Sequence, residues 1–352
     1  MTTAITQRVF GTTPAGETVT EFTLTNQRGS IAKIINFGGI ITELHVRDKN
    51  GNLGDVVLGF ETLEPYLEKS PFFGALIGRV GNRIADARFV LDGVTYNLAA
   101  NNGPNSLHGG VQGFDKKIWS AEPFENAKGQ GLVLSLLSED GDQGFPGNLH
   151  VKVTYQFTHD DEIVVDYFAT TDKATPVNLT QHTYFNLAGN GDILNHTLQI
   201  FADHINAVNA VQIPVGSPLP VAGTPFDFRE PQLIGERINA NHEQIDNGLG
   251  YDHNFLINQI RYKSLTLAAR AEEDTSGRVL EVFTEEPGVQ FYSGNFLDGS
   301  LTGKGVNYKH RTGFCLEPQH APDSINQSQF PSIVLRPGEE YKTRTIFKLS
   351  VK

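Results

Sequence analysis

The chain has 352 residues, of which 39% are hydrophobic and 19% are charged, and this composition excludes an intrinsically disordered protein. Its 40 acidic and 28 basic residues give a formal net charge of -12, which disfavours binding to nucleic acids and to anionic membrane surfaces. We therefore expect a neutral or cationic ligand.

The first residues carry no targeting pattern. Residues 1–17 contain no basic stretch followed by the apolar run, about 7 to 15 residues long, that marks a signal peptide. The longest apolar runs, such as residues 72–78, are too short to cross a membrane. We expect a cytoplasmic protein that does not bind membranes.

Alternating apolar and polar residues predict an all-β protein. In residues 149–158 every second residue is apolar or aromatic and the others are polar, so one face is buried and the other is solvated. Residues 341–349 repeat the pattern. Further strands are predicted at residues 40–46, 55–58, 132–137, 163–169, 197–201, 264–271, 279–284 and 289–292.

Turn and helix signals complete the coarse prediction. Asp92 and Gly93 lie between two apolar runs and predict a hairpin with a type I′ turn, because both central residues need a positive φ. Helical patterns are confined to two short segments, residues 62–67 and 231–238. No low-complexity linker or repeat interrupts the chain, so we expect one antiparallel β domain over residues 1–352.

The single cysteine, Cys315, cannot form an intramolecular disulfide. It lies in the apolar stretch at residues 312–316, which predicts a buried strand. We expect an inert core thiol.

Three polar clusters, far apart in the sequence, fall in segments whose turn residues place them at strand ends or in loops. Residues 78–110 carry Asn82, Arg83 and His108, residues 178–189 carry His182, and residues 314–327 carry Glu317. Such positions on a rigid β scaffold are typical of binding and catalytic residues.

Each cluster also has a structural interpretation. A single histidine in a β protein is more often a hydrogen-bonded structural residue than a catalyst, and Arg83 could form a loop ion pair with Asp86. Glu317 follows an apolar run and precedes Pro318, so we expect it where a buried strand ends. A carboxylate there needs either partners or a chemical role, which favours function at Glu317.

The spacing of histidines and acids argues against a metal centre. There is no HxH or HExxH motif, and the close pair of Glu317 and His320 is interrupted by Pro318. The GxSxG elbow, the phosphate-binding loop and the glycine-rich strand-to-helix turn are also absent, which disfavours covalent hydrolases and nucleotide enzymes. We expect no metal and no cofactor.

In these segments the sequence resembles the galactose mutarotase, or aldose 1-epimerase, family. Seven motifs occur in the expected order and cover essentially the whole chain, at residues 36–61, 73–85, 105–119, 177–189, 251–257, 287–299 and 316–341. The resemblance implies a large antiparallel β supersandwich with an open sugar cleft. It also implies metal-free acid–base catalysis that interconverts the α and β anomers of free hexoses such as galactose and glucose.

The resemblance also implies residue roles. Glu317 of LEPQ is similar to the general base, His182 of TQHTYFNL to the general acid, and His108 of SLHGG to a second histidine that bonds the ring oxygen or a neighbouring hydroxyl. The implied hydroxyl-binding positions are Asn82, Arg83, Asp252 and Gln290. Gly81 and Asn254 depart from the family pattern at positions without a catalytic role.

Anomer exchange requires a cyclic hemiacetal to open and to close on the other face of its aldehyde. One base and one acid suffice for this, and we expect an ionised Glu317 and a protonated His182 that stabilise each other. Tyr184, Phe185 and Phe291 either stack on the sugar or pack in the core.

Other functions stay open at this point. A hexose-6-phosphate 1-epimerase would need a cationic pocket, for which Arg83, Arg88, Arg270 and Arg311 are candidates. A non-catalytic carbohydrate-binding protein of the same fold would need no acid and base pair. A glycosidase or lyase would need a second carboxylate beside Glu317. The sequence does not choose between galactose and glucose, or between a monomer and a homodimer.

Overall fold

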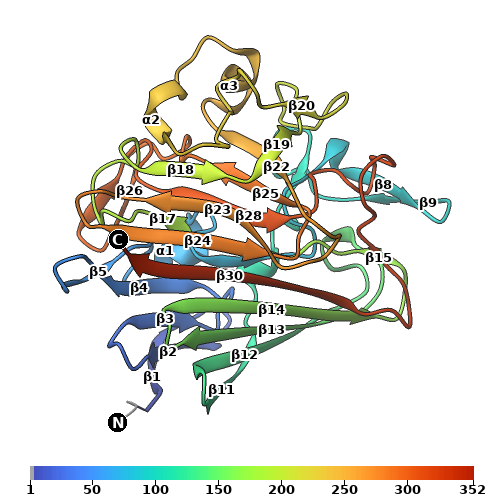
Figure 1. Cartoon of the computed structure of the whole chain (residues 1–352). Helices are drawn as coiled ribbons and strands as arrows, with labels where there is room; N and C mark the ends of the chain where they lie inside the picture. The colour runs from blue at the N-terminus through green and yellow to red at the C-terminus, as the bar shows by residue number, and fades with distance from the viewer. Residues whose placement is uncertain (1–3) are drawn as a thin grey trace.

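Long antiparallel hairpins dominate the computed structural model, which describes residues 4–352 (Figure 1). The largest sheet has nine strands, and the C-terminal strand β30 lies between β14 and β24, which come from the middle and the last third of the chain. In sheet order its strands are β11 (Ser120–Asn126), β12 (Gly129–Ser138), β13 (Leu149–Thr158), β14 (Glu162–Thr171), β30 (Tyr341–Val351), β24 (Arg278–Thr284), β23 (Thr266–Glu272), β18 (Thr197–Ile200) and β21 (Gln232–Leu233).

The predicted alternation of β13 and β30 is confirmed. In β30 the side chains of Phe347 and Leu349 are buried while Lys342 and Arg344 are exposed. Arg344 lies opposite Asp166 of β14 and donates to its carboxylate over 2.6 Å on the outer face. Exposed ion pairs contribute little to stability, so burial of the inner apolar face holds this sheet in place.

Two further sheets complete the scaffold. The first sheet holds, in order, β1 (Thr6–Thr12), β2 (Thr18–Thr25), β3 (Ile31–Ile35), β4 (Ile41–Arg47) and β5 (Leu53–Asp55). The six-stranded sheet holds, in order, β17 (Tyr184–Phe185), β28 (Phe314–Gln319), β25 (Gly288–Tyr292), β22 (Asp252–Ile257), β19 (Ala202–Ile205) and β20 (Leu219–Pro220).

Short elements connect the sheets. The two-stranded pairs are β6 (Ala75–Ile77) with β16 (Thr180–His182), β7 (Arg83–Ile84) with β10 (Ser106–Leu107), β8 (Arg88–Leu91) with β9 (Val94–Asn97), β15 (Thr175–Pro176) with β29 (Val334–Leu335), and β26 (Leu301–Gly303) with β27 (Val306–Tyr308). The helices are α1 (Glu64–Glu68), α2 (Ile234–Arg237) and α3 (Glu243–Gly248), and 3₁₀ turns occur at Ala85–Ala87, Phe114–Lys116 and Asp142–Gly144. The fold is all-β with few short helices, as expected.

Most local predictions are confirmed. Asp92 and Gly93 have φ values of 50° and 79° and connect β8 to β9 through the expected tight hairpin. The strand predicted at residues 55–58 is wrong, because β5 ends at Asp55 and its carboxylate accepts the backbone N–H groups of Leu44 and Val57. The helix predicted at residues 231–238 is confined to α2 and preceded by β21, and α3 was not predicted.

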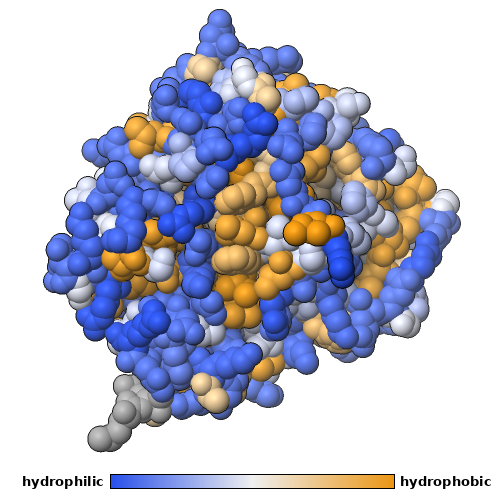
Figure 2. Space-filling view, in the orientation of Figure 1, coloured by the Kyte–Doolittle hydropathy of each residue, from blue (hydrophilic) through white to orange (hydrophobic). Residues whose placement is uncertain are grey.

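The main apolar cluster draws buried side chains from Phe22 near the N-terminus to Leu349 near the C-terminus. A second cluster around Tyr66, Phe73 and Tyr308 contains Cys315, which is fully buried in β28 as predicted. Figure 2 shows hydrophilic residues over most of one side of the molecule, with smaller apolar patches between them. None of the helices within residues 4–352 is long and apolar enough to cross a membrane.

Candidate active site

Strand register brings three of the predicted site residues onto one face of the six-stranded sheet. Gln290 of β25 lies directly opposite Glu317 of β28 on one side and Asn254 of β22 on the other. Directly opposite residues of antiparallel strands point to the same face, and so does Asp252, two residues before Asn254. The sheet therefore orients Asp252, Gln290 and Glu317 together.

Glu317 lies inside its strand rather than at the strand end that we expected. β28 continues through Pro318, which pairs with Val289, to Gln319. On its other side β28 pairs with β17 only at Phe314 and Cys315. Pro318 therefore lies in the part of β28 that has no β17 strand beside it. Its missing N–H costs no hydrogen bond between β28 and β17 there.

Glu317 faces His182 of β16. Their side chains are only 3% and 5% exposed, and His182 Nε2 lies 3.5 Å from Glu317 Oε2. Within residues 4–352 this carboxylate oxygen has no hydrogen-bond partner. On the other side of the imidazole, Cys315 Sγ lies 3.6 Å from Nδ1. A buried carboxylate oxygen without a partner is costly, and a bound ligand or a catalytic role is one explanation for it.

The second predicted histidine, His108, packs beside the first. The rings of His108 and His182 are 5.0 Å apart at an angle of 85°, and Phe72 contacts both of them. His108 Nδ1 accepts the backbone N–H of Asn82 over 3.1 Å, which leaves Nε2 to face the cleft as a donor. The loop passes so close to Gly78 that a Cβ on Gly109, whose φ is 87°, would lie 1.9 Å from the Gly78 carbonyl oxygen.

Burial shifts the pKa values of this pair toward the neutral forms. It lowers the pKa of His182 to about 4. It raises the pKa of Glu317 well above its ordinary value, with Asp252 adding to the rise and Arg83 opposing it. These directions run against the expectation of an ionised Glu317 beside a protonated His182, because desolvation is the largest cause of both shifts.

Burial also lowers the pKa of His108 well below its ordinary value, and His182 and Arg83 add to that shift.

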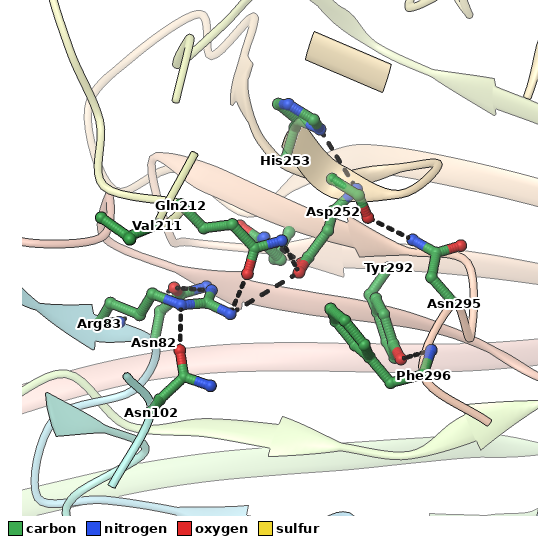
Figure 3. A network of polar contacts seen from close by, with 12 residues as sticks. Asn82, Arg83, Asn102, Val211, Gln212, Asp252, His253, Tyr292, Asn295 and Phe296 are labelled. Atoms are coloured by element: carbon green, nitrogen blue, oxygen red, sulfur yellow. Dashed lines mark hydrogen bonds and ion pairs between the residues drawn. The ribbon is translucent and has the colours of Figure 1, made fainter. Parts of the chain in front are cut away.

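Arg83 and Asp252 form a second polar part of the cleft wall, and Figure 3 shows the hydrogen bonds that join them to their neighbours. Arg83 Nη2 lies 3.9 Å from Asp252 Oδ2, and the pair is almost fully buried. Gln290 donates to Asp252 Oδ1 over 2.7 Å. Burial raises the pKa of Asp252, while Arg83 and the amide of Gln290 act in the opposite direction. The loop ion pair between Arg83 and Asp86 is not formed, because Arg83 is directed into the cleft.

Two residues that the sequence analysis missed complete this network. Asn102 accepts from Arg83 Nε over 2.9 Å, and Gln212 contacts both Arg83 and Asp252. Asn82 also accepts from the Arg83 backbone N–H and guanidinium. Asn102 and Gln212 lie in loops without periodicity and outside the seven motifs, so neither pattern marked them.

One cleft with a cavity volume of about 120 Å³ is lined by Asn82, Arg83, Asn102, His108, His182, Asp252 and Glu317. Tyr184, Tyr292 and Phe296 form apolar parts of its wall, and the Tyr184 ring stacks on His182 at 5.1 Å. Phe185 and Phe291 belong to the main apolar cluster instead, so core packing is their role. Gln290 supports Asp252 from below and is not part of the cleft wall formed by the described residues.

Three side chains of the cleft also meet the geometry of a metal-ligand set. One ligand atom from each of His108, His182 and Glu317 lies within 4.8 Å of the others. The sequence spacing did not predict this convergence, because the three residues come from separate elements. The set contains two imidazoles and one carboxylate, ligands that suit zinc, so the donor chemistry by itself is compatible with a metal ion.

The sequence profile of the aldose 1-epimerase family matches residues 20–348. The chain belongs to the aldose 1-epimerase family. The chain is 48% identical over 352 residues to a galactose mutarotase from Homo sapiens, with 99% of each chain covered. It is 39% identical to an aldose 1-epimerase from Escherichia coli, with 95% of this chain and 96% of that protein covered.

Solved structures of the family have the same fold. A galactose 1-epimerase from Lactobacillus acidophilus is 27% identical, with 99% of each chain covered and a TM-score of 0.87. An aldose epimerase homologue from C. elegans is 29% identical, with a TM-score of 0.86 over 94% of this chain and 98% of that one. The predicted family, isomerase class and supersandwich fold are confirmed.

Proposed function

We propose that this aldose 1-epimerase interconverts the α and β anomers of free hexoses such as galactose and glucose, with Glu317 as the base and His182 as the acid. One observation carries the proposal: the unpartnered Glu317 Oε2 lies 3.5 Å from His182 Nε2, in the same small cleft as the Arg83 and Asp252 pair. The cleft thus combines an acid and base pair at one end with hydroxyl-binding groups at the other. The names of the relatives, galactose mutarotase and aldose 1-epimerase, support the same reaction.

In the opening step, Glu317 takes the proton of the anomeric hydroxyl while His182 gives a proton to the ring oxygen. The bond between C1 and the ring oxygen breaks, and the former hydroxyl oxygen becomes the aldehyde. After rotation about the C1–C2 bond, the reverse transfers close the ring on the other face. Proton transfers of this kind contribute about 10² to 10⁴ in rate, which suffices for a hemiacetal that also opens in water.

The proton count of the pair fits this cycle. A neutral Glu317 with a neutral His182 holds one proton, as does the ion pair of a carboxylate and an imidazolium. Transfer of that proton between Oε2 and Nε2 converts one form into the other without uptake from solvent. Polar sugar hydroxyls in the cleft would stabilise the charged form, because they replace part of the hydration that burial removes.

Arg83 and Asp252 anchor the far side of the sugar and leave C1 free to rotate. The guanidinium donates to hydroxyl oxygens, and the carboxylate accepts from hydroxyl protons. His108 donates through Nε2 to the ring oxygen or a neighbouring hydroxyl, because its Nδ1 already accepts from Asn82. Asn82 positions Arg83 as well as binding the sugar edge.

A free sugar fits this cleft better than a sugar phosphate. Arg83 is the one basic side chain, other than histidine, in the cleft wall formed by the described residues. Three of its five N–H donors are already bonded to Asn82, Asn102 and Gln212, and the two that remain suit hydroxyl oxygens better than the several oxygens of a phosphate. Of the other arginines considered, Arg270 is paired with Glu272 and Glu281, and Arg311 donates to Asn239.

Polarimetry on freshly dissolved α-D-galactose, α-D-glucose and glucose 6-phosphate tests the proposal. We expect the protein to speed the approach to anomeric equilibrium for the free sugars, and the His182→Asn variant to lose most of that acceleration. No acceleration by folded wild-type protein would contradict the proposed function. Acceleration with the phosphate ester alone would favour the phosphosugar epimerase.

The organisation of the protein is part of the same proposal. The apolar cluster that joins residues from Phe22 to Leu349 supports one domain over residues 1–352. A monomer or a homodimer in the cytoplasm stays a prediction, which size-exclusion chromatography with light scattering would test for the oligomeric state.

A further inference from the structure

Gln212 lies in the loop between β19 and β20 and contacts both Arg83 and Asp252, the two residues that form the anchoring end of the cleft. Its φ is 61°, and its backbone N–H donates to Asn209 O over 2.8 Å. The side chain of Asn209 accepts from the N–H groups of Val211 and Ile213, which closes the turn around Gln212. The loop thus holds a non-glycine residue in a left-handed conformation that costs free energy.

The loop is also fastened to the segment that carries His108. Asn105 Nδ2 donates to Val211 O over 2.9 Å, although the two residues are far apart in the sequence. Gln327 Nε2 donates to Pro214 O from the other side. These bonds fix the position from which the Gln212 side chain reaches Arg83 and Asp252.

The amide of Gln212 bridges the two charged residues of the anchoring end (Figure 3). Its carbonyl oxygen accepts from Arg83 Nη2, and its Nε2 donates to Asp252 Oδ2 over 2.9 Å. The side chain is buried, with the residue 8% exposed. The polarity of the amide matches the ion pair: its negative end meets the cation and its positive end meets the anion.

We propose that Gln212 is a positioning residue that holds Arg83 and Asp252 apart, so that both can bind sugar hydroxyls. This inference rests on the proposed function. A direct bond between a guanidinium and a carboxylate is about 2.7 to 2.9 Å long, whereas Arg83 Nη2 and Asp252 Oδ2 are 3.9 Å apart. The amide between them makes one hydrogen bond to each group. The remaining donors of Arg83 and acceptors of Asp252 stay available to the sugar.

Without the Gln212 amide, we expect Arg83 and Asp252 to move together and form a direct ion pair. Both side chains are desolvated, and a buried charge without a hydrogen-bond partner is costly. A direct contact between the two opposite charges lowers that cost. Glu317, Tyr292 and Gln290 also face Asp252 and do not replace the lost donor to Oδ2. Closure would use the faces of Arg83 and Asp252 that the sugar needs, while Glu317 and His182 would keep their geometry.

The test is the steady-state mutarotation of α-D-galactose by wild-type protein and by Gln212→Met, which keeps the length of the side chain and removes both hydrogen bonds. We expect KM to rise about tenfold and kcat to stay within about threefold. Val211→Ala, a neighbouring exposed residue of the same loop, is the matched control and should leave both constants unchanged. Thermal unfolding reports whether each variant is folded.

Gln212→Glu provides a second, independent variant. It keeps an acceptor for Arg83 but places a carboxylate against Asp252, so KM should rise at least as much as in Gln212→Met. An unchanged KM in either folded variant, or a fall in kcat at constant KM, would overturn the inference. Wild-type protein without mutarotase activity would instead contradict the proposed function, and so the two failures are distinguishable.

Discussion

Among residues 4–352, two histidine and glutamate pairs are buried, and one of them lines the cleft. In the cleft pair, His182 Nε2 and Glu317 Oε2 are 3.5 Å apart. In the other pair, His320 Nδ1 and Glu286 Oε2 are 2.6 Å apart. The side chains of both pairs are no more than 6% exposed, so burial does not distinguish them.

The pairs differ in how well their polar atoms are satisfied. His320 bonds Glu286 through one ring nitrogen and approaches the Tyr262 hydroxyl through the other, while its backbone N–H donates to Asn178. Glu317 Oε2, by contrast, has no partner among the described residues. We therefore interpret the fully hydrogen-bonded pair of Glu286 and His320 as structural. In the pair of Glu317 and His182, a ligand can supply the missing hydrogen bond.

The largest expected effect is on catalysis at the cleft pair. Glu317→Gln removes the proposed base while it keeps the size of the side chain, and kcat for α-D-galactose should fall about 10² to 10⁴-fold. The free energy of unfolding should change by less than about 1 kcal/mol, because the lost oxygen had no hydrogen bond to protein. Proton NMR of the anomeric signals measures the first quantity and urea unfolding the second. Near-normal turnover would remove Glu317 from the mechanism.

The opposite result is expected at the satisfied pair. Glu286→Leu leaves the His320 ring nitrogen buried without its partner, and the free energy of unfolding should fall by about 3 kcal/mol. The kcat of the folded fraction should stay within about threefold of wild type. Glu317→Leu is the matched control. In that variant kcat should fall to a small fraction of the wild-type value, while the free energy of unfolding should not fall. If Glu286→Leu abolished turnover in folded protein, the comparison between the two pairs would fail.

The scaffold could be predicted from the period of its long strands. Part of the site could be predicted only from motifs, because its elements are too short to show a period. Strands such as β13 and β30 are long enough for burial of one face to impose a period of two residues. The elements that carry His182 and Arg83 are two or three residues long, so no periodicity could reveal them. Those residues were identified through the motifs of a family resemblance.

Contacts between distant segments set the limit of that prediction. The expectation that Gln290 binds a hydroxyl stays a prediction, and its hydrogen bond to Asp252 is a contact that the sequence could not show. Gln212 reaches Arg83 and Asp252 from a loop that Asn105 and Gln327 hold in place. The charge state of Glu317 and His182 depends on how completely they are buried, and this is a property of the packed molecule.

The pH dependence of turnover gives a finer test of the cleft pair. The reactive pair holds one proton, so activity requires a pH above the pKa of His182 and below that of Glu317. As the pH falls through about 4, His182 gains a second proton and kcat should fall. As the pH rises through the raised pKa of Glu317, the pair loses its proton and kcat should fall again.

Polarimetry, corrected for the spontaneous reaction at each pH, measures this profile, and circular dichroism shows whether the protein stays folded. An acid limb near pH 6.5, the ordinary pKa of histidine, would contradict the desolvated environment of His182. A profile without any acid limb down to the onset of unfolding would remove His182 as the acid.

The smallest expected effect concerns the metal-ligand set, which shares His182 and Glu317 with the cleft pair. In the proposed mechanism a proton on His182, not a metal ion, neutralises the developing charge on the ring oxygen. A metal ion bound to His182 Nε2 would block that proton, so we expect activity to survive dialysis against EDTA within about twofold and added Zn²⁺ to inhibit. Polarimetry before and after dialysis, with metal content measured by mass spectrometry, checks both expectations. Loss of activity that Zn²⁺ restores would show that these three side chains form a metal centre, and would turn the contrast with Glu286 and His320 into one between a metal site and a structural pair.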